Sequence, residues 1–331
     1  MGIVRWGLLS TANINRRVIP AIRASRRGKL VGIASRTLDS ARSYAAHWEI
    51  PLAFGSYEEM LASDAVNAVY ISLPNHLHAE WTIKALQAGK HVLCEKPFAL
   101  TLAEVDAVIA AAHATNLVVS EAFMYRHHPQ TKIVGEWVRS GRLGEISLVR
   151  STFNFSMNTR DNIRLVPEWG GGSLWDVGVY PLSFAQYIMG EPPLWVSGAQ
   201  WLGESGTDET FAGQLVYSGN RLAQISSAFR TPFFTYAEVI GTAGRLFLNR
   251  PFTMLDETRE LLFYPAHGTG EHIAVPVQEL YRGEIADMHA AILDGEPPYL
   301  TLNETRNHIK TVLALYAAAT QQRIVHLTEI S

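Results

Sequence analysis

A lysine follows an apolar run in the stretch "VLCEKPFAL", residues 92–100. The letters VLC are typical of a buried strand, and Lys96 comes directly after it, between Glu95 and Pro97. Burying an ammonium group at such a junction costs free energy unless the group is paired or has a task. Lys96 is therefore a candidate for chemistry, with Glu95 or Glu121 as its expected structural partner. We also expect a cis Lys96–Pro97 bond, of the kind that tight turns retain.

A second group of residues that could take part in catalysis lies in "EWGGGSLWDVGVYPL", residues 168–182. Asp176 and Tyr180 are four residues apart, so a helix would place them on one face. The structural alternative is that Ser173 caps this helix and Asp176 completes a capping box with it. That alternative does not explain the three preceding glycines, which indicate a close approach of the backbone to some other group.

The elements that would position these residues change type along the chain. Up to about residue 122, apolar runs alternate with helical patterns, which predicts right-handed βαβ units and a doubly wound parallel sheet. The expected strands are 3–9, 29–35, 66–73, 91–95 and 117–121, and helices over about 13–26 and 38–47 follow the first two. Ligands of such sheets bind beyond the carboxyl ends of the strands. The residues expected at these ends are Ser10, Ser35, Pro74, Lys96 and Glu121.

The second half predicts an α+β domain with a large, mainly antiparallel sheet. Helices are expected over about 129–140, 173–189, 280–293 and 302–320, and a strand over 145–156. Between 194 and 276, six strand-like runs separated by turns suggest a meander. We therefore expect a dinucleotide-binding domain over 1–122 and a substrate-binding and oligomerisation domain over 123–331, whose C-terminal helix packs back on the first.

The first strand runs into "WGLLSTANI", where the dinucleotide fingerprint would have glycines at the turn. Only Gly7 is a glycine, but Ser10 and Ala12 are small enough for backbone amides to approach a pyrophosphate. After the second strand, "SRT" replaces the acidic residue that usually binds the ribose of NAD. Because the fork of Arg36 suits a 2′-phosphate, NADP is favoured over NAD. The alternative is that Arg36 is an ordinary solvated loop residue.

These motifs together resemble the glucose–fructose oxidoreductase, inositol dehydrogenase and rhizopine-catabolism (Gfo/Idh/MocA) family. The resemblance rests on "WGLLSTANI", "LPNHLHAEWTIKALQAGKHVLCEKP", "EAFMYRHHP" and "GGGSLWDVGVYPL", and it covers about residues 3 to 190. Inositol dehydrogenases have histidine where this chain has Tyr180. With tyrosine at this position, the sequence resembles the branch of the family that contains dimeric dihydrodiol dehydrogenase, NADP-linked xylose dehydrogenases and glucose–fructose oxidoreductase.

The resemblance implies a role for each matching position. Lys96 would bind the reacting oxygen beside the nicotinamide, Tyr180 would give or take the proton, and Asp176 would orient the substrate or the lysine. The residues expected to bind the cofactor are Gly7, Ser10, Thr11, Ala12, Asn13, Ile14, Ser35, Arg36, Thr37, Leu73, Pro74, Asn75, His78, Glu95, Lys96, Glu121 and Ala122. Those expected to bind substrate are Tyr125, Arg126, Phe155, Trp169, Asp176 and Tyr180, with Arg160 and Arg164 as further candidates. For His78 a purely structural role is the favoured alternative.

The expected chemistry is hydride transfer between NADP(H) and a hydroxyl or carbonyl carbon of an aldose or related cyclic polyol. A tyrosine titrates near 10, and a neighbouring lysine would lower its pKa and stabilise alkoxide character on the substrate. A trans-dihydrodiol dehydrogenase or a ketosugar reductase is the alternative within the branch. A sensor that binds dinucleotide or sugar without turnover is the alternative of another class, although it would not need Lys96, Asp176 and Tyr180 together.

The composition narrows the partners and the location. The chain has 28 basic and 31 acidic residues among 331, a net charge of −3. It therefore has no excess of basic residues that would indicate binding to nucleic acid or to an anionic membrane. One cysteine, Cys94, leaves no disulfide framework, and no metal site is expected. The N-terminus lacks signal-peptide features and no apolar run reaches the length of a membrane span. We expect a cytoplasmic enzyme, assembled as a homodimer or a dimer of dimers through the C-terminal sheet.

Overall fold

The computed structural model describes residues 2–159, 161–253 and 260–331, and these form two compact units. Unit 1 comprises the chain up to His127 together with Tyr281–Arg306. Unit 2 comprises His128–Leu280 and Asn307–Ser331. Residues 281–306, which the sequence analysis assigned to the second domain, are thus grouped with the first.

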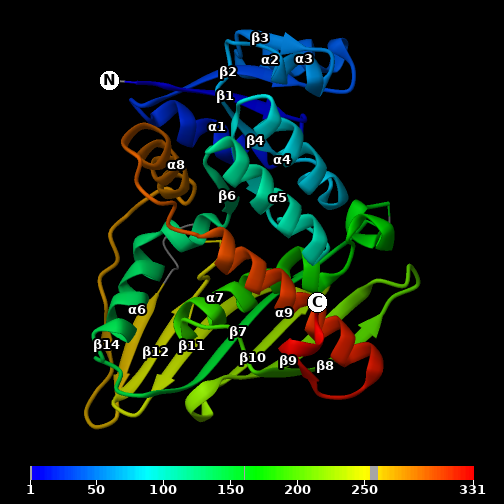
Figure 1. Ribbon diagram of the computed structural model, residues 1–331. Helices are drawn as coiled ribbons and strands as arrows, with labels where there is room; N and C mark the ends of the chain where they lie inside the picture. The colour runs from blue at the N-terminus through cyan, green and yellow to red at the C-terminus, as the bar shows by residue number, and fades with distance from the viewer. Residues whose placement is uncertain (1, 160, 254–259) are drawn as a thin grey trace. The chain divides into compact units, whose positions relative to one another are not determined.

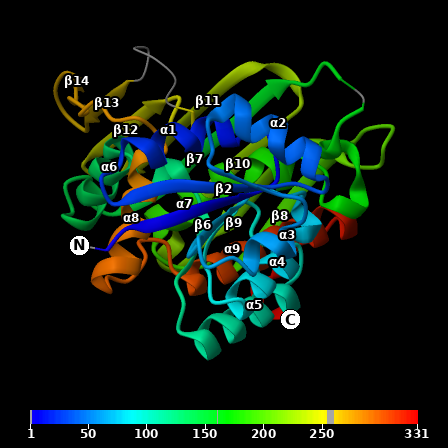
Figure 2. The same ribbon diagram turned by 90° about the horizontal axis from the view of Figure 1, so that it is seen from above.

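Unit 1 is built on a six-stranded sheet in the order β3-β2-β1-β4-β5-β6, with every pair parallel. Helices α1 and α2 lie on one side of β1 and β2, and α4 and α5 lie on the other (Figure 2). This confirms the doubly wound parallel sheet. The strands are Val4–Leu9, Gly28–Ala34, Leu52–Phe54, Ala68–Ile71, His91–Glu95 and Val119–Ala122, and the helices are α1 (Asn15–Ala24), α2 (Leu38–Trp48), α3 (Tyr57–Leu61), α4 (His78–Gln87), α5 (Leu102–Thr115) and α8 (Arg282–Asp294).

The central strands are buried on both faces because helices cover both sides of the sheet. All four residues of β4 are buried, and so are the apolar residues of β1 from Trp6 onward. The short elements β3 and α3, of three and five residues, were not predicted from the sequence. Elements this short do not repeat a hydrophobic period often enough to be recognised.

Helix α8 is fixed to the first strand by a buried histidine, His289. The indole N–H of Trp6 donates to its Nε2 at 2.9 Å, and its Nδ1 lies 3.1 Å from the hydroxyl of Ser25. Because an indole can only donate, the proton of the neutral ring is on Nδ1. Burial lowers the pKa of His289 to about 4, with a smaller contribution from Arg27, because the imidazolium loses its water.

This histidine should make the folded state less stable at acidic pH. The pKa of a histidine in an unfolded chain is about 6.5, and that of His289 in the folded chain is about 4. The unfolded chain therefore binds a proton that the folded chain does not, and stability falls as pH drops below 6.5, by at most about 1.4 kcal/mol per pH unit. We expect this slope in urea unfolding between pH 7.5 and 5, and a flatter one in His289→Gln, whose amide keeps both hydrogen bonds. Equal slopes in the two proteins would contradict the assignment.

Unit 2 is built on a nine-stranded sheet in the order β14-β13-β12-β11-β7-β10-β9-β8-β15. All its pairs are antiparallel except β7 with β10, which confirms the large, mainly antiparallel sheet. Its strands are Ile146–Ser156, Trp195–Leu202, Asp208–Val216, Leu222–Ala228, Arg230–Gly241, Gly244–Asn249, Leu261–Pro265, Glu271–His272 and Val325–His326, numbered β7 to β15, and its helices are α6 (Pro129–Arg139), α7 (Val179–Met189) and the greater part of α9 (Leu302–Gln321).

The expected meander is wrong at one point. Strands β8 to β10 form one meander and β11 to β14 form another, but β7 lies between β10 and β11 and pairs with both. The chain passes from β10 to β11 through the single residue Phe229, so the two strands look like neighbours in the sequence. The strand that separates them comes from much earlier in the chain, and no local pattern indicates its insertion.

One face of this sheet carries the core of unit 2. Val149, Ala223, Leu215 and Val239 are buried there, and α7 packs on β7. Helices α6, α7 and α9 lie over this face, as Figure 1 shows. In the described part of the chain, no helix is long and apolar enough to span a membrane.

Candidate active site

The turn after β1 is held by side-chain hydrogen bonds where the fingerprint has glycines. Ser10 adopts a left-handed φ of 97°, a conformation that favours glycine. Its hydroxyl accepts from the amide of Ala12 at 3.1 Å, and Asn15 Nδ2 donates to its carbonyl at 2.7 Å. Asn15 also accepts from the hydroxyl of Ser72 at 2.8 Å. Asn15 was not predicted as a site residue, although residues 10, 12 and 15 have the G-x-G-x-x-G spacing.

The three residues after β2 have different surroundings. Ser35 is buried and its amide donates to Phe54 O at 3.2 Å. Thr37 caps α2 by accepting from Ser40 N at 3.3 Å. Arg36 is exposed. Of the three, only Arg36 therefore presents an exposed cationic side chain at the carboxyl end of β2.

His78 connects the ends of β4 and β5. Its ring nitrogens lie 2.7 Å from Pro97 O and 2.7 Å from Leu73 O. Burial lowers the pKa of His78, whereas the two carbonyls act in the opposite direction. A buried ring between two backbone carbonyls fixes the turn that carries Lys96. Pro74 and Asn75 lie between Leu73 and His78 in the chain, where Pro74 precedes a 3₁₀ turn that begins at Asn75.

Lys96 lies in a turn that unit 1 holds from several sides. The Lys96–Pro97 bond is cis, as expected. The carboxylate of Glu95 accepts from the hydroxyl of Tyr70 and from the amide of Lys96, the latter at 3.2 Å. These contacts fix the backbone of Lys96, whose side chain is half-buried.

Glu121 on β6 anchors the same turn from the next strand. Its Oε1 accepts from Phe98 N at 3.1 Å and its Oε2 from the hydroxyl of Thr305 at 3.0 Å. Burial raises the pKa of Glu121 to about 8, although both donors favour the carboxylate. The next residue, Ala122, is buried as well.

The motif "EAFMYRHHP" supplies core residues of unit 1. Tyr125 is fully buried with its ring edge-on to Phe123, their centroids 6.0 Å apart. Arg126 is also buried, and its Nη1 lies 2.5 Å from a carboxylate oxygen of Glu304. Both residues were expected to bind substrate, and the structure gives them close partners inside unit 1.

In unit 2 the glycine run leads into a π-helical turn, Leu174–Gly178, which continues as α7. The capping box considered above as the structural alternative is not formed, because Ser173 has helical backbone angles and its side chain makes no cap bond. The helix is capped instead by Asp208 on β9, whose Oδ2 accepts from Leu174 N at 2.8 Å and from Ser173 Oγ at 2.7 Å. Tyr316 of α9 donates to its Oδ1 at 2.7 Å. Burial raises the pKa of Asp208.

The glycines are explained by contacts within unit 2. A Cβ on Gly171 would lie 2.7 Å from the carbonyl oxygens of Arg164 and Val166. A Cβ on Gly172, whose φ is 122°, would lie 2.1 Å from Asp208 Oδ1. The close approach that the glycines indicated is therefore to a neighbouring loop and to Asp208. An aspartate at the start of a strand is a weak signal, so the sequence did not reveal this partner.

Asp176 and Tyr180 lie beside a cation and an aromatic cluster. Asp176 Oδ2 is 2.6 Å from Arg164 Nε. Tyr180 is only 6% exposed, and its ring centroid lies 5.5 Å from that of Phe153 and 5.7 Å from that of Phe252. The Asp176 carboxylate, and to a smaller extent Tyr180, raise the pKa of Arg164. The Asp176–Arg164 ion pair thus lies at the start of this helix, and the ring of Tyr180, four residues later, packs against the apolar rings of Phe153 and Phe252.

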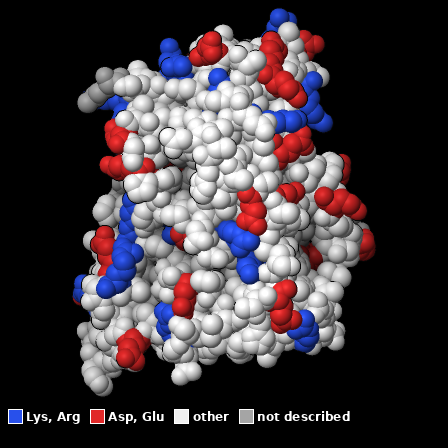
Figure 3. All heavy atoms as spheres, viewed as in Figure 1, with Lys and Arg blue, Asp and Glu red and all other residues white. Residues whose placement is uncertain are grey.

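The remaining expected residues are dispersed. Trp169 is exposed in a 3₁₀ turn before the glycines, and Phe155 is half-buried with its ring 5.2 Å from Phe229. Arg160 lies outside the described residues. Within those residues, no cluster of three or more His, Cys, Asp or Glu side chains has the arrangement of a metal site. Acidic and basic side chains are mixed on the face shown in Figure 3.

A parallel sheet of this order, with a small-residue turn after its first strand, is typical of dinucleotide-binding domains. The family model described as "Oxidoreductase family, NAD-binding Rossmann fold" matches residues 4–123, and the GFO/IDH/MocA C-terminal domain matches residues 131–247. The chain belongs to the Gfo/Idh/MocA family, as its motifs indicated, and is an NAD(P)-dependent oxidoreductase.

Several similar proteins align with nearly the whole chain. A D-xylose 1-dehydrogenase (NADP(+)) of Haloferax volcanii is 36% identical, over 97% of this chain and 99% of its own. The structure of an aldose-aldose oxidoreductase from Caulobacter crescentus, complexed with glycerol, has a TM-score of 0.91 at 25% identity and covers 98% of this chain and 99% of its own. That of a 3-ketoreductase from Actinomadura kijaniata with NADP and TDP-benzene has a TM-score of 0.89 at 29% identity, over 96% and 98%.

Proposed function

We propose that this oxidoreductase uses NADP(H) to interconvert a hydroxyl and a carbonyl on an aldose or a related cyclic polyol. Lys96 binds the reacting oxygen, Tyr180 transfers its proton, and Asp176 orients the substrate or the lysine. The functions named for the xylose dehydrogenase and the aldose-aldose oxidoreductase support this substrate class.

The observation that carries the proposal is the row of strand ends in unit 1. Ser10 follows β1, Leu73 and Pro74 follow β4, and Lys96 follows β5. These strands are adjacent and parallel, so their carboxyl ends lie at one edge of the sheet. A dinucleotide with its pyrophosphate at the β1 turn would extend along this edge, and Lys96 would then lie close to its nicotinamide.

The chain's own groups fit such a cofactor. In the described part of the chain, the amides of Asn13 and Ile14 at the start of α1 donate no hydrogen bond, so they can donate to a phosphate. Arg36 supplies an exposed cation after β2. When bound, the cofactor supplies or accepts the hydride. Lys96 would stabilise negative charge on the substrate oxygen, while Tyr180 transfers the proton and the rings of Phe153 and Phe252 exclude water.

The proposed substrate class is tested by absorbance at the wavelength of NADPH, with NADP⁺ and a panel of aldoses, cyclic polyols and trans-dihydrodiols. We expect turnover with at least one aldose or polyol. A trans-dihydrodiol is the second candidate, since the aromatic rings beside Tyr180 pack on a ring of that kind as well as on a sugar. Binding of NADP⁺ without turnover of any compound would support a sensor instead and would refute the proposal.

Arg36 should decide the choice between NADP and NAD. Replacing it with alanine removes the guanidinium that would pair with the 2′-phosphate, a contact worth about 1.5–3 kcal/mol as a charged hydrogen bond. We expect the Arg36→Ala variant to have a KM for NADP⁺ raised about tenfold or more, and an unchanged KM for NAD⁺. An equal effect on both cofactors would show that Arg36 does not bind the phosphate.

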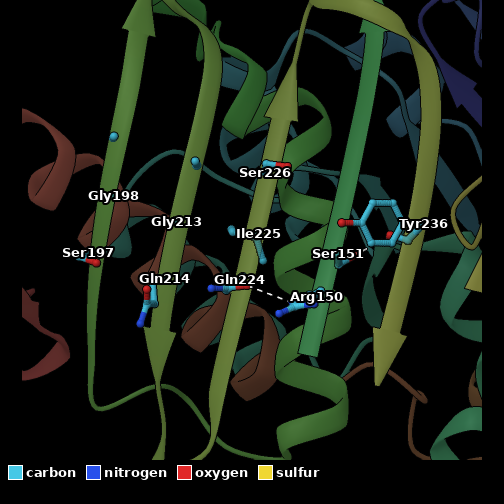
Figure 4. Close-up of a pocket in the computed structure, with 12 residues that line it drawn as sticks. Arg150, Ser151, Ser197, Gly198, Gly213, Gln214, Gln224, Ile225, Ser226 and Tyr236 are labelled. Atoms are coloured by element: carbon cyan, nitrogen blue, oxygen red, sulfur yellow. Dashed lines mark hydrogen bonds between the residues drawn. The ribbon is translucent and has the colours of Figure 1, made fainter. Parts of the chain in front are cut away.

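The outer face of the nine-stranded sheet is the proposed dimer interface. Its strands line a shallow hollow of about 510 Å³, mostly with small residues such as Gly198, Ala212 and Gly213. Figure 4 shows this hollow, with Arg150 bonded to Gln224 at 3.2 Å across two strands. By strand register, Trp201 and Phe234, which are 48% and 46% exposed, lie in one row on this face.

The dimer is tested by sedimentation of the wild type and of Ala212→Arg, which would fill the hollow with a charged side chain. We expect a dimer, or a dimer of dimers, that dissociates in the variant. A monomeric wild type would refute this interface. We also propose a cytoplasmic location, because the NADP(H) that the enzyme would use is an intracellular metabolite, and activity confined to a secreted fraction would contradict it.

A further inference from the structure

The loop that carries Arg164 is fixed at both sides of this residue. Asn162 Oδ1 accepts from Arg164 N at 3.1 Å and lies 3.4 Å from its Nη1. The carbonyl of Arg164 accepts from Gly172 N at 2.9 Å. Gly171 must be a glycine for this contact, because its Cβ would lie 2.7 Å from the Arg164 carbonyl oxygen. The glycine run therefore docks the Arg164 loop against the start of the π-helical turn.

The loop places the guanidinium of Arg164 against the carboxylate of Asp176. Arg164 Nε lies 2.6 Å from Asp176 Oδ2, while the side chains are 41% and 14% exposed. Asp176 is itself held through its amide, which donates to Gly172 O at 3.0 Å. Both partners are thus fixed by the same glycine, and the ion pair joins two segments of constrained backbone.

Tyr180 follows Asp176 by four residues, about one helical turn, so its side chain extends from the same side of the helix as the ion pair. Asp176 is the main cause that raises the pKa of Arg164, and Tyr180 contributes in the same direction. Conversely, a cation at this place favours the carboxylate of Asp176 and the phenolate of Tyr180. In the described part of the chain, the other charged or titratable groups packed around this turn include Asp208 with Tyr316, and His308, whose Nε2 lies 3.1 Å from Val179 O.

We propose that Arg164 is a positioning residue for the reaction, which holds Asp176 in one orientation and supplies the cation beside the Tyr180 hydroxyl. This inference rests on the proposed function of Asp176 and Tyr180. In this role Arg164 acts on Asp176 and Tyr180. The sequence suggested instead that Arg164 binds hydroxyls or a carboxylate of the substrate directly. An ordinary half-exposed ion pair would contribute only about 0–1 kcal/mol to stability and nothing to the pH dependence of turnover.

The test compares the pH profiles of kcat for the wild type, Arg164→Met and Arg164→Lys in the direction of alcohol oxidation. Without the cation, the inflection assigned to Tyr180 should move to higher pH by about one unit or more, so kcat at pH 7 should fall about tenfold and recover at alkaline pH. Lysine keeps the charge and should restore part of the shift. Tyr180→Phe should remove the inflection.

A matched control is Arg221→Met, which breaks the Arg221–Glu191 ion pair at the other end of α7. We expect it to leave kcat and its pH profile unchanged and to melt within a few degrees of Arg164→Met. If Arg164→Met raised only the KM for substrate and left the pH profile of kcat in place, Arg164 would be a substrate ligand and the inference would be overturned.

A second readout does not depend on turnover. Ultraviolet titration of tyrosine ionisation in the wild type and in Tyr180→Phe isolates the titration of Tyr180 by difference. This titration should move to higher pH in the Arg164→Met background, and an unmoved titration would refute the inference. If the wild type turned over no substrate while the titration moved, the proposed function would fail and the electrostatic role of Arg164 would stand.

Discussion

Replacing Lys96 by methionine or Tyr180 by phenylalanine is expected to lower kcat by about 10²-fold or more in each case. The first change removes the cation that would stabilise charge on the substrate oxygen, and the second removes the group that transfers its proton. Since the two side chains would act on the same oxygen, the double variant should lose little more than the worse single one. Steady-state kinetics with NADP⁺ and the best aldose or polyol of the panel measure all three.

The control for this prediction is Lys84→Met, which removes an exposed lysine paired with Glu80 on α4 at 2.6 Å. It should retain the kcat of the wild type. Turnover close to wild type in both Lys96→Met and Tyr180→Phe would refute the assignment. Multiplied losses in the double variant would instead mean that the two residues act independently.

Replacing Gly172 by alanine is expected to cost the most stability among the changes considered. The new Cβ would lie 2.1 Å from Asp208 Oδ1 and 2.9 Å from the hydroxyl oxygen of Tyr316, at a φ of 122°. Backbone strain and overpacking each cost about 1–3 kcal/mol, so the loss should be about 3–5 kcal/mol, a large part of the usual stability of a domain. Urea unfolding measures it.

Gly190→Ala is the matched control, because Gly190 also has a positive φ, 73°, but nothing lies within 4 Å of its added Cβ. It should lose only about 1–2 kcal/mol, the cost of the left-handed backbone alone. Equal losses in the two variants would mean that the contact with Asp208 is not tight. The folded fraction of Gly172→Ala should also have reduced kcat, since Asp208 caps the turn that carries Asp176.

The two predictions use different kinds of information. Lys96 could be singled out from sequence because a charge directly after an apolar run is costly there and its position, at the end of a strand, follows from the alternation of strands and helices. The role of Gly172 follows only from the tertiary structure. The glycine run indicated a close approach, but the partner, Asp208, lies 36 positions further along the chain and is brought there by β9.

The candidate site likewise has some features that the sequence predicted and others that only the structure shows. The sequence placed Ser10, Pro74 and Lys96 at strand ends, and the sheet order puts these ends at one edge of unit 1. It did not show that Thr37 serves as a helix cap, that Arg126 is buried against Glu304, or that Glu121 binds Thr305. Glu304 and Thr305 come from α9, 178 and 184 residues further along the chain than Arg126 and Glu121, and no spacing rule connects segments so far apart.

The sequence by itself determined the parallel sheet, the mainly antiparallel second sheet, the family and the principal candidate residues, because these depend on local hydrophobic periods and on motifs within short stretches. Only the tertiary structure decided that β7 separates β10 from β11, that Asp208 caps the π-helical turn and that Arg164 is bound to Asp176. The physical reason is the range of the interactions. A period of two or 3.6 residues is set by the backbone of a single segment, whereas a buried carboxylate or an inserted strand takes its partners from whatever the folded chain brings within a few ångströms.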